Sequence, residues 1–193
     1  MRAMRKYLAA SLLGLSLSLA AQTNTAASQS QSNEKLIQMA QEDQLARTSA
    51  LTQAERAKAF QADATRLAAV KEMIAQNQLA TGLDYFNAAL IMQHGQTSDD
   101  YLLAHTLAVI GISKGNRNCI WLSAATLDRY LFSMKQPQIY GTQSHRLDPA
   151  KPFTMEPYAD QLVTDGLRKE LDVPAEAVQK QRLDKLNQSL LAK

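Results

Sequence analysis

Residues that interrupt regular structure are scarce in this chain. Glycine occurs 7 times and proline 5 times among 193 residues, while 46% of the residues are hydrophobic. An all-β fold needs many turn residues and many β-branched strand residues, so this composition argues against it. Alanine, leucine and glutamine, which favour helices, are abundant instead. We therefore predict an all-α fold, a compact domain of about five to seven helices.

The first 21 residues have the layout of a secretory signal peptide. Arg2, Arg5 and Lys6 precede an apolar run over residues 8–20, and small residues around Ala20 offer a cleavage site. The run is short for a membrane span, which needs about 20 apolar residues. We therefore predict a signal peptide over 1–21, a periplasmic or secreted protein, and no stable membrane anchor after cleavage. An uncleaved anchor is the alternative.

The basic surplus of the chain belongs to this leader. The whole chain has 21 basic and 18 acidic residues, a net charge of +3. Because three of the bases lie in the leader, the remaining chain is balanced, and a nucleic-acid partner loses its electrostatic support. Cys119 is the single cysteine, so no internal disulfide can form. Its apolar neighbours predict that it is buried, with a raised pKa that makes it a poor nucleophile.

A spacer and one helical domain follow the leader. Residues 22–32 are polar, small and low in complexity, which predicts a disordered spacer. Residues 33–193 form the predicted single helical domain, with an ordered irregular loop near 135–155. Thr52 and Glu55 match a capping box, which marks a helix start. The helices are predicted to begin at Asn33 and after Thr52, and to cover 83–94, 100–114, 117–134, 158–170 and 174–190.

Helical spacing also predicts which side chains share a face. In the first helix, these are Leu36, Met39, Ala40 and Asp43. In the second helix, they are Phe60, Ala64, Leu67, Lys71 and Ile74. The helix over 117–134 is apolar almost all round, which is typical of a central helix.

Two charged residues interrupt that apolar helix. Asp128 and Arg129 stand among apolar neighbours, and an isolated buried charge is so costly that each needs a partner. Adjacent residues diverge by about 100° on a helix, so they pair with different segments. One interpretation is a buried ion-pair network that fixes helix packing. The other is a polar site in a groove, with Asp128 as an acid, base or ligand-binding group and Arg129 as an anion clamp.

Further polar candidates lie at His94 and in the loop. His94 closes an apolar helix, where it either interacts with the helix dipole or serves a site. The loop string QPQIYGTQ over 136–143 contains Gln138, Tyr140 and Gln143, which can wrap a polar ligand or satisfy buried helix ends. His105 is expected to be a core or boundary residue rather than a ligand, and His145 is expected to be exposed.

Common catalytic and cofactor signatures are missing. The chain has no G-x-S-x-G elbow, no P-loop and no dinucleotide-binding G-x-G-x-x-G. The three histidines match no zinc spacing, although a metal site from His94, Asp128 and a loop residue is an alternative. We therefore predict neither a cofactor nor a metal, and no reaction is named by a motif.

Four segments together resemble a bacterial family of domains of unknown function. The shared strings are D-Q-x-x-R (Asp43 to Arg47), a Q-H pair (Gln93 and His94), and D-R followed by Q-x-Y-G-T-Q. The resemblance covers roughly 34–178. It departs at the end, where the family has a paired arginine and Gly-Leu-Pro. The resemblance implies an all-helical fold and one shared polar cluster, but no activity.

The residue patterns and the resemblance select the same side chains. We hypothesise that they converge, with the aspartates neutralising the arginines: Asp43, Arg47, His94, Asp128, Arg129, Gln138, Tyr140 and Gln143. Two functions follow from the sequence. The first is a non-enzymatic binding or interaction module of the cell envelope, with an envelope ligand or protein as partner. The second is a small periplasmic hydrolase that uses Asp128, Arg129 and His94.

Overall fold

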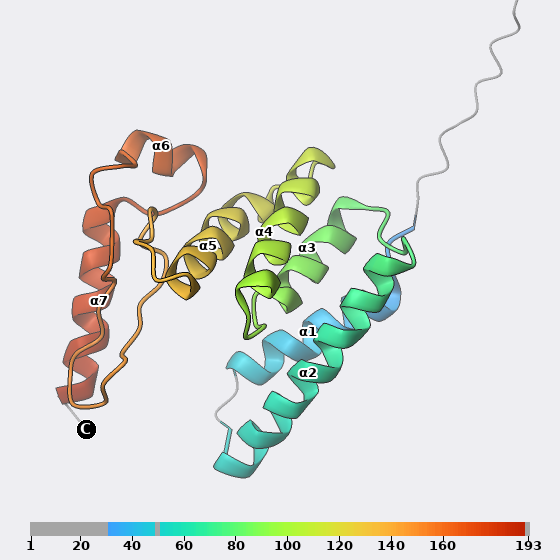
Figure 1. The fold of residues 1–193 in the computed structure, drawn as a ribbon, viewed down its shortest axis with the longest axis horizontal. Coiled ribbons are helices and arrows are strands. Elements are labelled where there is room, and N and C mark those ends of the chain that lie inside the picture. The colour runs from blue at the N-terminus through green and yellow to red at the C-terminus, as the bar shows by residue number, and fades with distance from the viewer. Residues whose placement is uncertain (1–30, 49–50, 192–193) are drawn as a thin grey trace, which may run out of the picture.

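The computed structural model describes residues 31–48 and 51–191 (Figure 1). Within these residues it contains seven helices, and the only strand-like pairings there are two isolated bridges, so the all-α prediction is confirmed. The helices are α1 (Glu34–Thr48), α2 (Gln53–Ala75), α3 (Gly82–Met92), α4 (Ser98–Ser113), α5 (Asn118–Ser133), α6 (Asp165–Glu170) and α7 (Glu176–Leu191). The predicted leader and nearly all of the predicted spacer lie outside the described residues.

Capping boxes start three successive helices. The side chain of Thr52 before α2 accepts a hydrogen bond from the backbone N–H of Glu55, and the Glu55 carboxylate accepts one from the backbone N–H of Thr52, as the sequence predicted. Thr81 before α3 and Thr97 before α4 form the same reciprocal pair with Asp84 and Asp100. Thr97 therefore caps α4. Each box satisfies backbone donors that a helix start leaves without partners.

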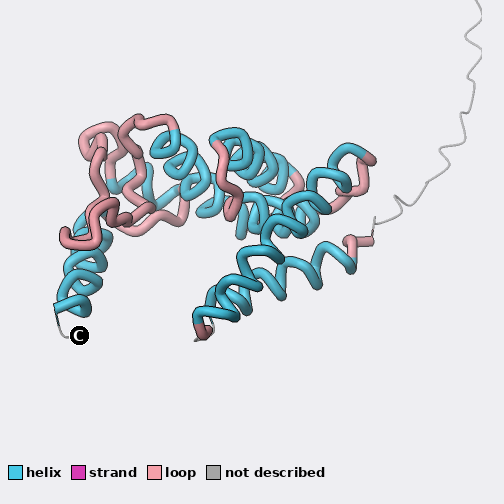
Figure 2. Tube along the Cα trace, turned by 60° about the horizontal axis from the view of Figure 1, so that its bottom comes forward, coloured by secondary structure: helices cyan, strands magenta, loops and turns pink. Residues whose placement is uncertain are grey.

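Helices α1 to α5 share one apolar core. Helix α3 packs against α1, α2, α4 and α5, and α1 also packs against α2. Figures 1 and 2 show α1 and α2 as a hairpin at one end of the row formed by α3, α4 and α5. Each of these five helices contributes fully buried side chains to the core, among them Leu36, Val70, Ile91, Ala108 and Leu122.

Helices α4 and α5 approach closely at a glycine. A Cβ atom added at Gly111 would lie 2.3 Å from the Sγ atom of Cys119. Cys119 is fully buried, and this burial raises the pKa of its thiol to about 11, so both predictions about this residue are confirmed. Helix α5 was expected to be central because it is apolar almost all round, but its Trp121 is 42% exposed.

The buried face of α2 differs from the prediction. Phe60 is 60% exposed, and Lys71 is also exposed. The buried positions of α2 are Asp63, Arg66, Val70 and Met73. The predicted face is rotated by about one residue, because polar side chains of α2 are buried against partners on α1. On α1 the predicted face is confirmed, with Leu36, Ala40 and Asp43 all buried.

The C-terminal part is less helical than predicted. Residues 134–164 form an irregular connection, and α6 begins only at Asp165, so the expected helix start near Tyr158 is wrong. The backbone N–H of Ala159 donates to the carbonyl of Gln138 at 2.9 Å, and that of Gln138 donates to Pro157 at 3.0 Å. These tertiary hydrogen bonds replace the first turn of a helix there. In both views α7 lies away from the α1–α2 hairpin.

No helix in the described part of the chain combines the length and apolarity that crossing a bilayer requires.

Candidate functional site

A network of opposite charges joins α1 to α2. On α1, Arg47 binds Asp43 at 3.1 Å and reaches Asp63 of α2 at 2.9 Å. On α2, Arg66 binds Asp63 at 2.6 Å and lies 3.8 Å from Asp43. The two acids thus balance the two bases, and both acids are buried. We call these four residues with His94 the Asp43 cluster.

His94 adds a third element to the Asp43 cluster. Its Nδ1 atom lies 2.9 Å from a carboxylate oxygen of Asp43 and 3.1 Å from Nε of Arg47. Nδ1 cannot carry a proton for Asp43 and accept one from Arg47 at once, and the shorter contact favours a proton shared with Asp43. Burial alone would raise the pKa of Asp43. The hydrogen bond and charge of His94, with the charge of Arg47, hold that pKa below its ordinary value.

Asp128 holds the loop that follows α5. Its side chain is fully buried, and its carboxylate accepts backbone N–H bonds from Ile139 at 2.8 Å, Tyr140 at 3.0 Å and Thr142 at 2.9 Å. The hydroxyl of Thr142 adds a bond at 2.7 Å. Charge-assisted bonds of this kind compensate a buried carboxylate without a cation. The predicted ion-pair network around Asp128 is therefore wrong among the described residues, since these loop donors take its place.

Gln138 and Gln143 fix the same loop from inside. Gln138 is fully buried, donates from Nε2 to the carbonyl oxygens of Gln143 and Met155, and accepts the backbone N–H of Gln143 at 3.0 Å. Gln143 in turn donates from Nε2 to the carbonyl of Ala125 at 3.2 Å, on α5. These amides satisfy protein groups, which makes the loop rigid rather than adaptable.

Tyr140 connects the loop to α6 and α7 through its backbone. Its carbonyl oxygen accepts hydrogen bonds from Arg168 of α6 and from Gln179 of α7. Arg168 is fully buried and also donates to the hydroxyl of Tyr158. Burial raises the pKa of the Tyr140 phenol, and the charge of Asp128 raises it further, so this phenol is a weak acid. Arg168 therefore holds the loop against α6 through these hydrogen bonds.

Arg129 differs from the other arginines of these clusters. Within the described part of the chain it makes no hydrogen bond and no ion pair, and its Nε atom is buried without a partner. Burial lowers the pKa of its guanidinium; the Tyr101 phenol opposes this shift, and the charge of Arg47 adds to it. A guanidinium still stays protonated near neutral pH. Arg129 is therefore a partly buried cation that has no acidic partner among the described residues.

A small pocket opens beside Arg129. Its volume is about 210 Å³. The residues that line it come from α4, α5 and the loop: Tyr101, Arg129, Phe132, Gln143, Ser144 and His145. We call this space the Arg129 pocket. His145 is only partly exposed, and its ring lies 4.0 Å from the ring of Phe132, so the expectation of an exposed His145 is wrong. Burial also lowers the pKa of His145.

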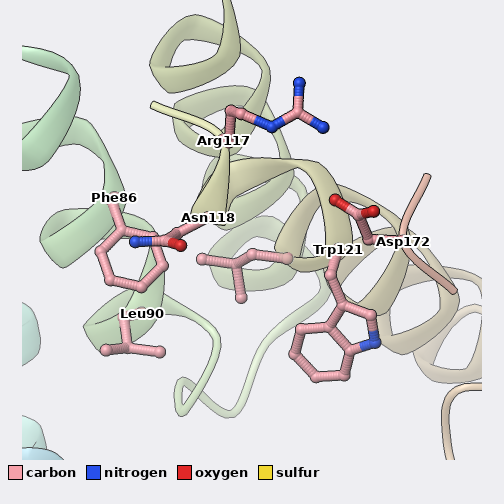
Figure 3. A pocket seen from close by; sticks show the side chains of 7 residues that line it. Phe86, Leu90, Arg117, Asn118, Trp121 and Asp172 are labelled. Atoms are coloured by element: carbon pink, nitrogen blue, oxygen red, sulfur yellow. The ribbon is translucent and has the colours of Figure 1, made fainter. Parts of the chain in front are cut away.

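A larger cleft of about 500 Å³ lies between α3 and α5 (Figure 3). Phe86, Leu90 and Trp121 give it apolar walls, and Arg117 and Asp172 lie at its edge. In Figure 3 the guanidinium of Arg117 extends away from Phe86 and Leu90. Polar groups do not converge on this cleft as they do on the Arg129 pocket, so it is the weaker candidate for a specific site.

The structure divides the predicted site residues among three places. Asp43, Arg47 and His94 contact one another in the Asp43 cluster. A second group, at the loop that follows α5, consists of Asp128, Gln138 and Tyr140. Arg129 and Gln143 meet at the Arg129 pocket. The described contacts do not join Asp43 to Asp128 directly.

Several residues of these places were missed from the sequence. Asp63 and Arg66 continue to Val70 and Met73 with a spacing of three, four and three, a helical face that the sequence already contained. Tyr101 and Ser144 line the pocket, but no sequence pattern marks them.

Metal ligands do not gather in the described residues. No group of three or more histidine, cysteine, aspartate or glutamate side chains there could hold a metal ion. His105, expected in the core or at its boundary, is partly buried, and its Nδ1 lies 2.9 Å from the carbonyl oxygen of Ser123. Comparison of the chain with protein-family models, with curated proteins and with solved structures found no match.

Proposed function

We propose that this protein is a non-enzymatic binding module that holds a small anionic ligand at Arg129. One observation carries the proposal: within the described residues, Arg129 has neither an acid nor a hydrogen-bond partner, although its Nε is buried. A partly buried cation without an acidic partner among the described residues costs folding free energy, and a ligand that supplies the negative charge would offset that cost.

The surroundings of Arg129 support this reading. The acids Asp43 and Asp63 are already engaged by Arg47 and Arg66. Asp128, the neighbour of Arg129 in sequence, is occupied by the loop. None of these carboxylates is therefore available to neutralise Arg129, while the Arg129 pocket leaves space beside it. A guanidinium suits carboxylate and phosphate groups because its donors match two oxygen atoms at once.

Calorimetric titration tests the proposal. Acetate, benzoate, phosphate and sulfate are titrated separately into the purified protein and into the Arg129→Gln variant. At least one anion is expected to bind the unchanged protein and to lose at least tenfold in affinity with the variant. Arg117→Gln, which removes a cation at the larger cleft, serves as a matched control and is expected to bind normally. Equal binding by the Arg129→Gln variant, or no binding by any of the four anions, would overturn the proposal.

We also propose that the module works in the cell envelope, as a periplasmic or secreted protein whose partner is an envelope ligand or protein. The support is the layout of residues 1–21, in which basic residues come first, an apolar run follows, and small residues suited to cleavage come last. The test is the N-terminal sequence of the protein recovered from the envelope and from the medium. A new N-terminus near Gln22 is expected. An intact Met1 in the cytoplasmic fraction would contradict the proposal.

A small periplasmic hydrolase is the second candidate, and one contact favours it. The bond of His94 Nδ1 to Asp43 would orient the ring and leave Nε2 as a base. Asp128, in contrast, is engaged by loop donors and is a poor base for such an enzyme. Turnover of a chromogenic ester panel, lost in a His94→Gln variant, would favour this candidate over a binding module.

A further inference from the structure

The Arg129 pocket has aromatic walls. The ring centroids of Phe132 and His145 lie 4.0 Å apart with the planes tilted by 39°, so the two rings stack on one another, and both residues line the pocket. Tyr101 of α4 adds a third ring to the lining. Aromatic side chains prefer flat partners in offset or edge-to-face contact. This composition favours a ligand with a flat apolar body in addition to its charge.

The pocket supplies one positive charge. Of its lining residues, only Arg129 is a permanent cation, because burial holds the pKa of His145 below its ordinary value and keeps the ring neutral near pH 7. Gln143 is fixed by bonds from its Nε2 to Ala125 and Thr142. One guanidinium matches one carboxylate in a two-point contact. The charge balance therefore favours a monoanion.

The size of the pocket limits the rest of the ligand. A volume of about 210 Å³ is below the range of about 300–1,000 Å³ typical of pockets for drug-sized molecules. At about 30 Å³ per water molecule in the liquid, it corresponds to about seven waters. One six-membered ring with one acidic group fits within this volume.

Resting on the proposed function, we propose that the ligand is a single-ring aromatic monocarboxylate. Its carboxylate would pair with Arg129, and its ring would lie against Phe132 and His145. The pairing supplies a counter-charge, and the ring covers the aromatic surface that the pocket leaves open.

Matched probes separate this inference from the proposed function. Benzoate, cyclohexanecarboxylate, acetate and inorganic phosphate are titrated calorimetrically into the purified protein at pH 7. Cyclohexanecarboxylate has the charge and nearly the size of benzoate but lacks a flat ring. Benzoate is expected to bind at least tenfold more tightly than each of the other three probes.

Two variants assign the effect to residues. Arg129→Gln is expected to weaken the binding of every carboxylate at least tenfold. Phe132→Leu is expected to lower the ratio of the affinities for benzoate and cyclohexanecarboxylate to less than threefold. Circular dichroism melting checks that both variants fold. If Phe132→Leu does not fold, the benzoate ring protons must show saturation transfer from the unchanged protein, and absence of transfer overturns the inference.

The possible failures are distinguishable. If acetate or phosphate binds as tightly as benzoate and Arg129→Gln abolishes both, the ligand class is wrong and the anion site stands. If cyclohexanecarboxylate binds as tightly as benzoate, the aromatic preference is wrong and the anion site again stands. If no probe binds, or if Arg129→Gln binds as the unchanged protein does, both the ligand class and the anion site are wrong.

Discussion

The hydroxyl of Thr142 donates to the carboxylate of Asp128 across 2.7 Å, and the backbone N–H of the same threonine donates to it across 2.9 Å. Through this pair, a single buried acid of α5 fixes the start of the loop that leads to α6 and α7. The relationship makes Asp128 a structural residue, and it can be tested by removing the charge while keeping the shape.

Asp128→Asn is expected to destabilise the protein. An amide keeps one acceptor oxygen but turns an NH2 group towards N–H donors, so buried backbone donors lose their partner. The expected loss is about 3 kcal/mol in the free energy of unfolding, measured by urea denaturation. Trp121, the single tryptophan, shares a small pocket with Gly141 and Thr142, so its fluorescence should also change. Asp184→Asn on exposed α7 is the control. Unchanged stability and fluorescence would show that Asp128 does not hold the loop.

Arg129 and Arg66 are expected to respond in opposite directions to loss of charge. Arg129→Met removes a cation without a partner among the described residues, so the melting temperature should stay equal or rise. Arg66→Met leaves the buried Asp63 without its contact at 2.6 Å. The expected cost is about 3 kcal/mol, or roughly 6–12 °C for a protein of this size. Differential scanning calorimetry of both variants gives the comparison. A large fall for Arg129→Met would mean that this arginine serves packing rather than binding.

The Asp43 cluster should make stability depend on acid pH. The pKa of Asp43 is lowered in the folded state, so below about pH 4 the unfolded chain binds more protons than the folded protein. The contribution of Asp43 is therefore fully present at neutral pH and is lost as the pH falls through its folded pKa. The pKa values of Asp84 and Asp100 are also lowered, by helix-start hydrogen bonds and, for Asp100, by Lys71, against a burial effect that raises them.

Asp43→Asn is consequently expected to reduce, in part, the loss of unfolding free energy that the protein shows as the pH falls. Urea denaturation between pH 2 and 7 measures the slope for the variant and for the unchanged protein. The two curves should converge at the lowest pH values, because Asp43 is protonated there in both states. Parallel curves over the whole range would contradict the pairing of Asp43 with His94 and Arg47.

Gly111 is expected to reject even a methyl group. Its Cβ would lie 2.3 Å from the Sγ of Cys119, and overpacking of this kind costs about 1–3 kcal/mol. Gly166→Ala is a matched control, since the nearest atom outside its chain neighbours lies 3.7 Å away. Adding Cys119→Ala to Gly111→Ala removes the clashing sulfur and should restore part of the loss. Thermal melts of the unchanged protein, the two single variants and the double variant form a double-mutant cycle. Additive effects of the two substitutions on stability would contradict a direct clash.

The sequence predicted the helices well where the signals are local. A capping box such as that of Thr52 and Glu55 acts within four residues, so its effect does not depend on the rest of the fold. The same signal was present at Thr81 and Thr97 with aspartate as the partner. Around Tyr158 the local helical preference lost to long-range hydrogen bonds with Gln138, which no local pattern contains.

The site was predictable in its residues but not in its pairings. Asp128 was correctly identified as buried, yet most of its partners are backbone N–H groups, which every residue except proline carries and which therefore leave no trace in a sequence. Asp63 and Arg66 lie outside the face of α2 that the sequence predicted, because the buried face is shifted by about one residue. The two acids that were expected to neutralise the arginines are engaged elsewhere, Asp43 by Arg47 and His94 and Asp128 by the loop.

The connected apolar core is drawn from α1 to α5, whereas polar bonds through Tyr140 and Asn187 attach α7. The C-terminal part also buries Met155, Val163 and Val173, but opening it alone would expose less apolar surface than opening the core, so its free energy would change less with urea concentration. Opening of the helical core would depend steeply on urea. Native-state amide exchange measured at increasing urea should therefore show two classes of amides. The free energy of opening would fall steeply with urea for amides of α1 to α5 and less steeply for amides that follow the loop after α5.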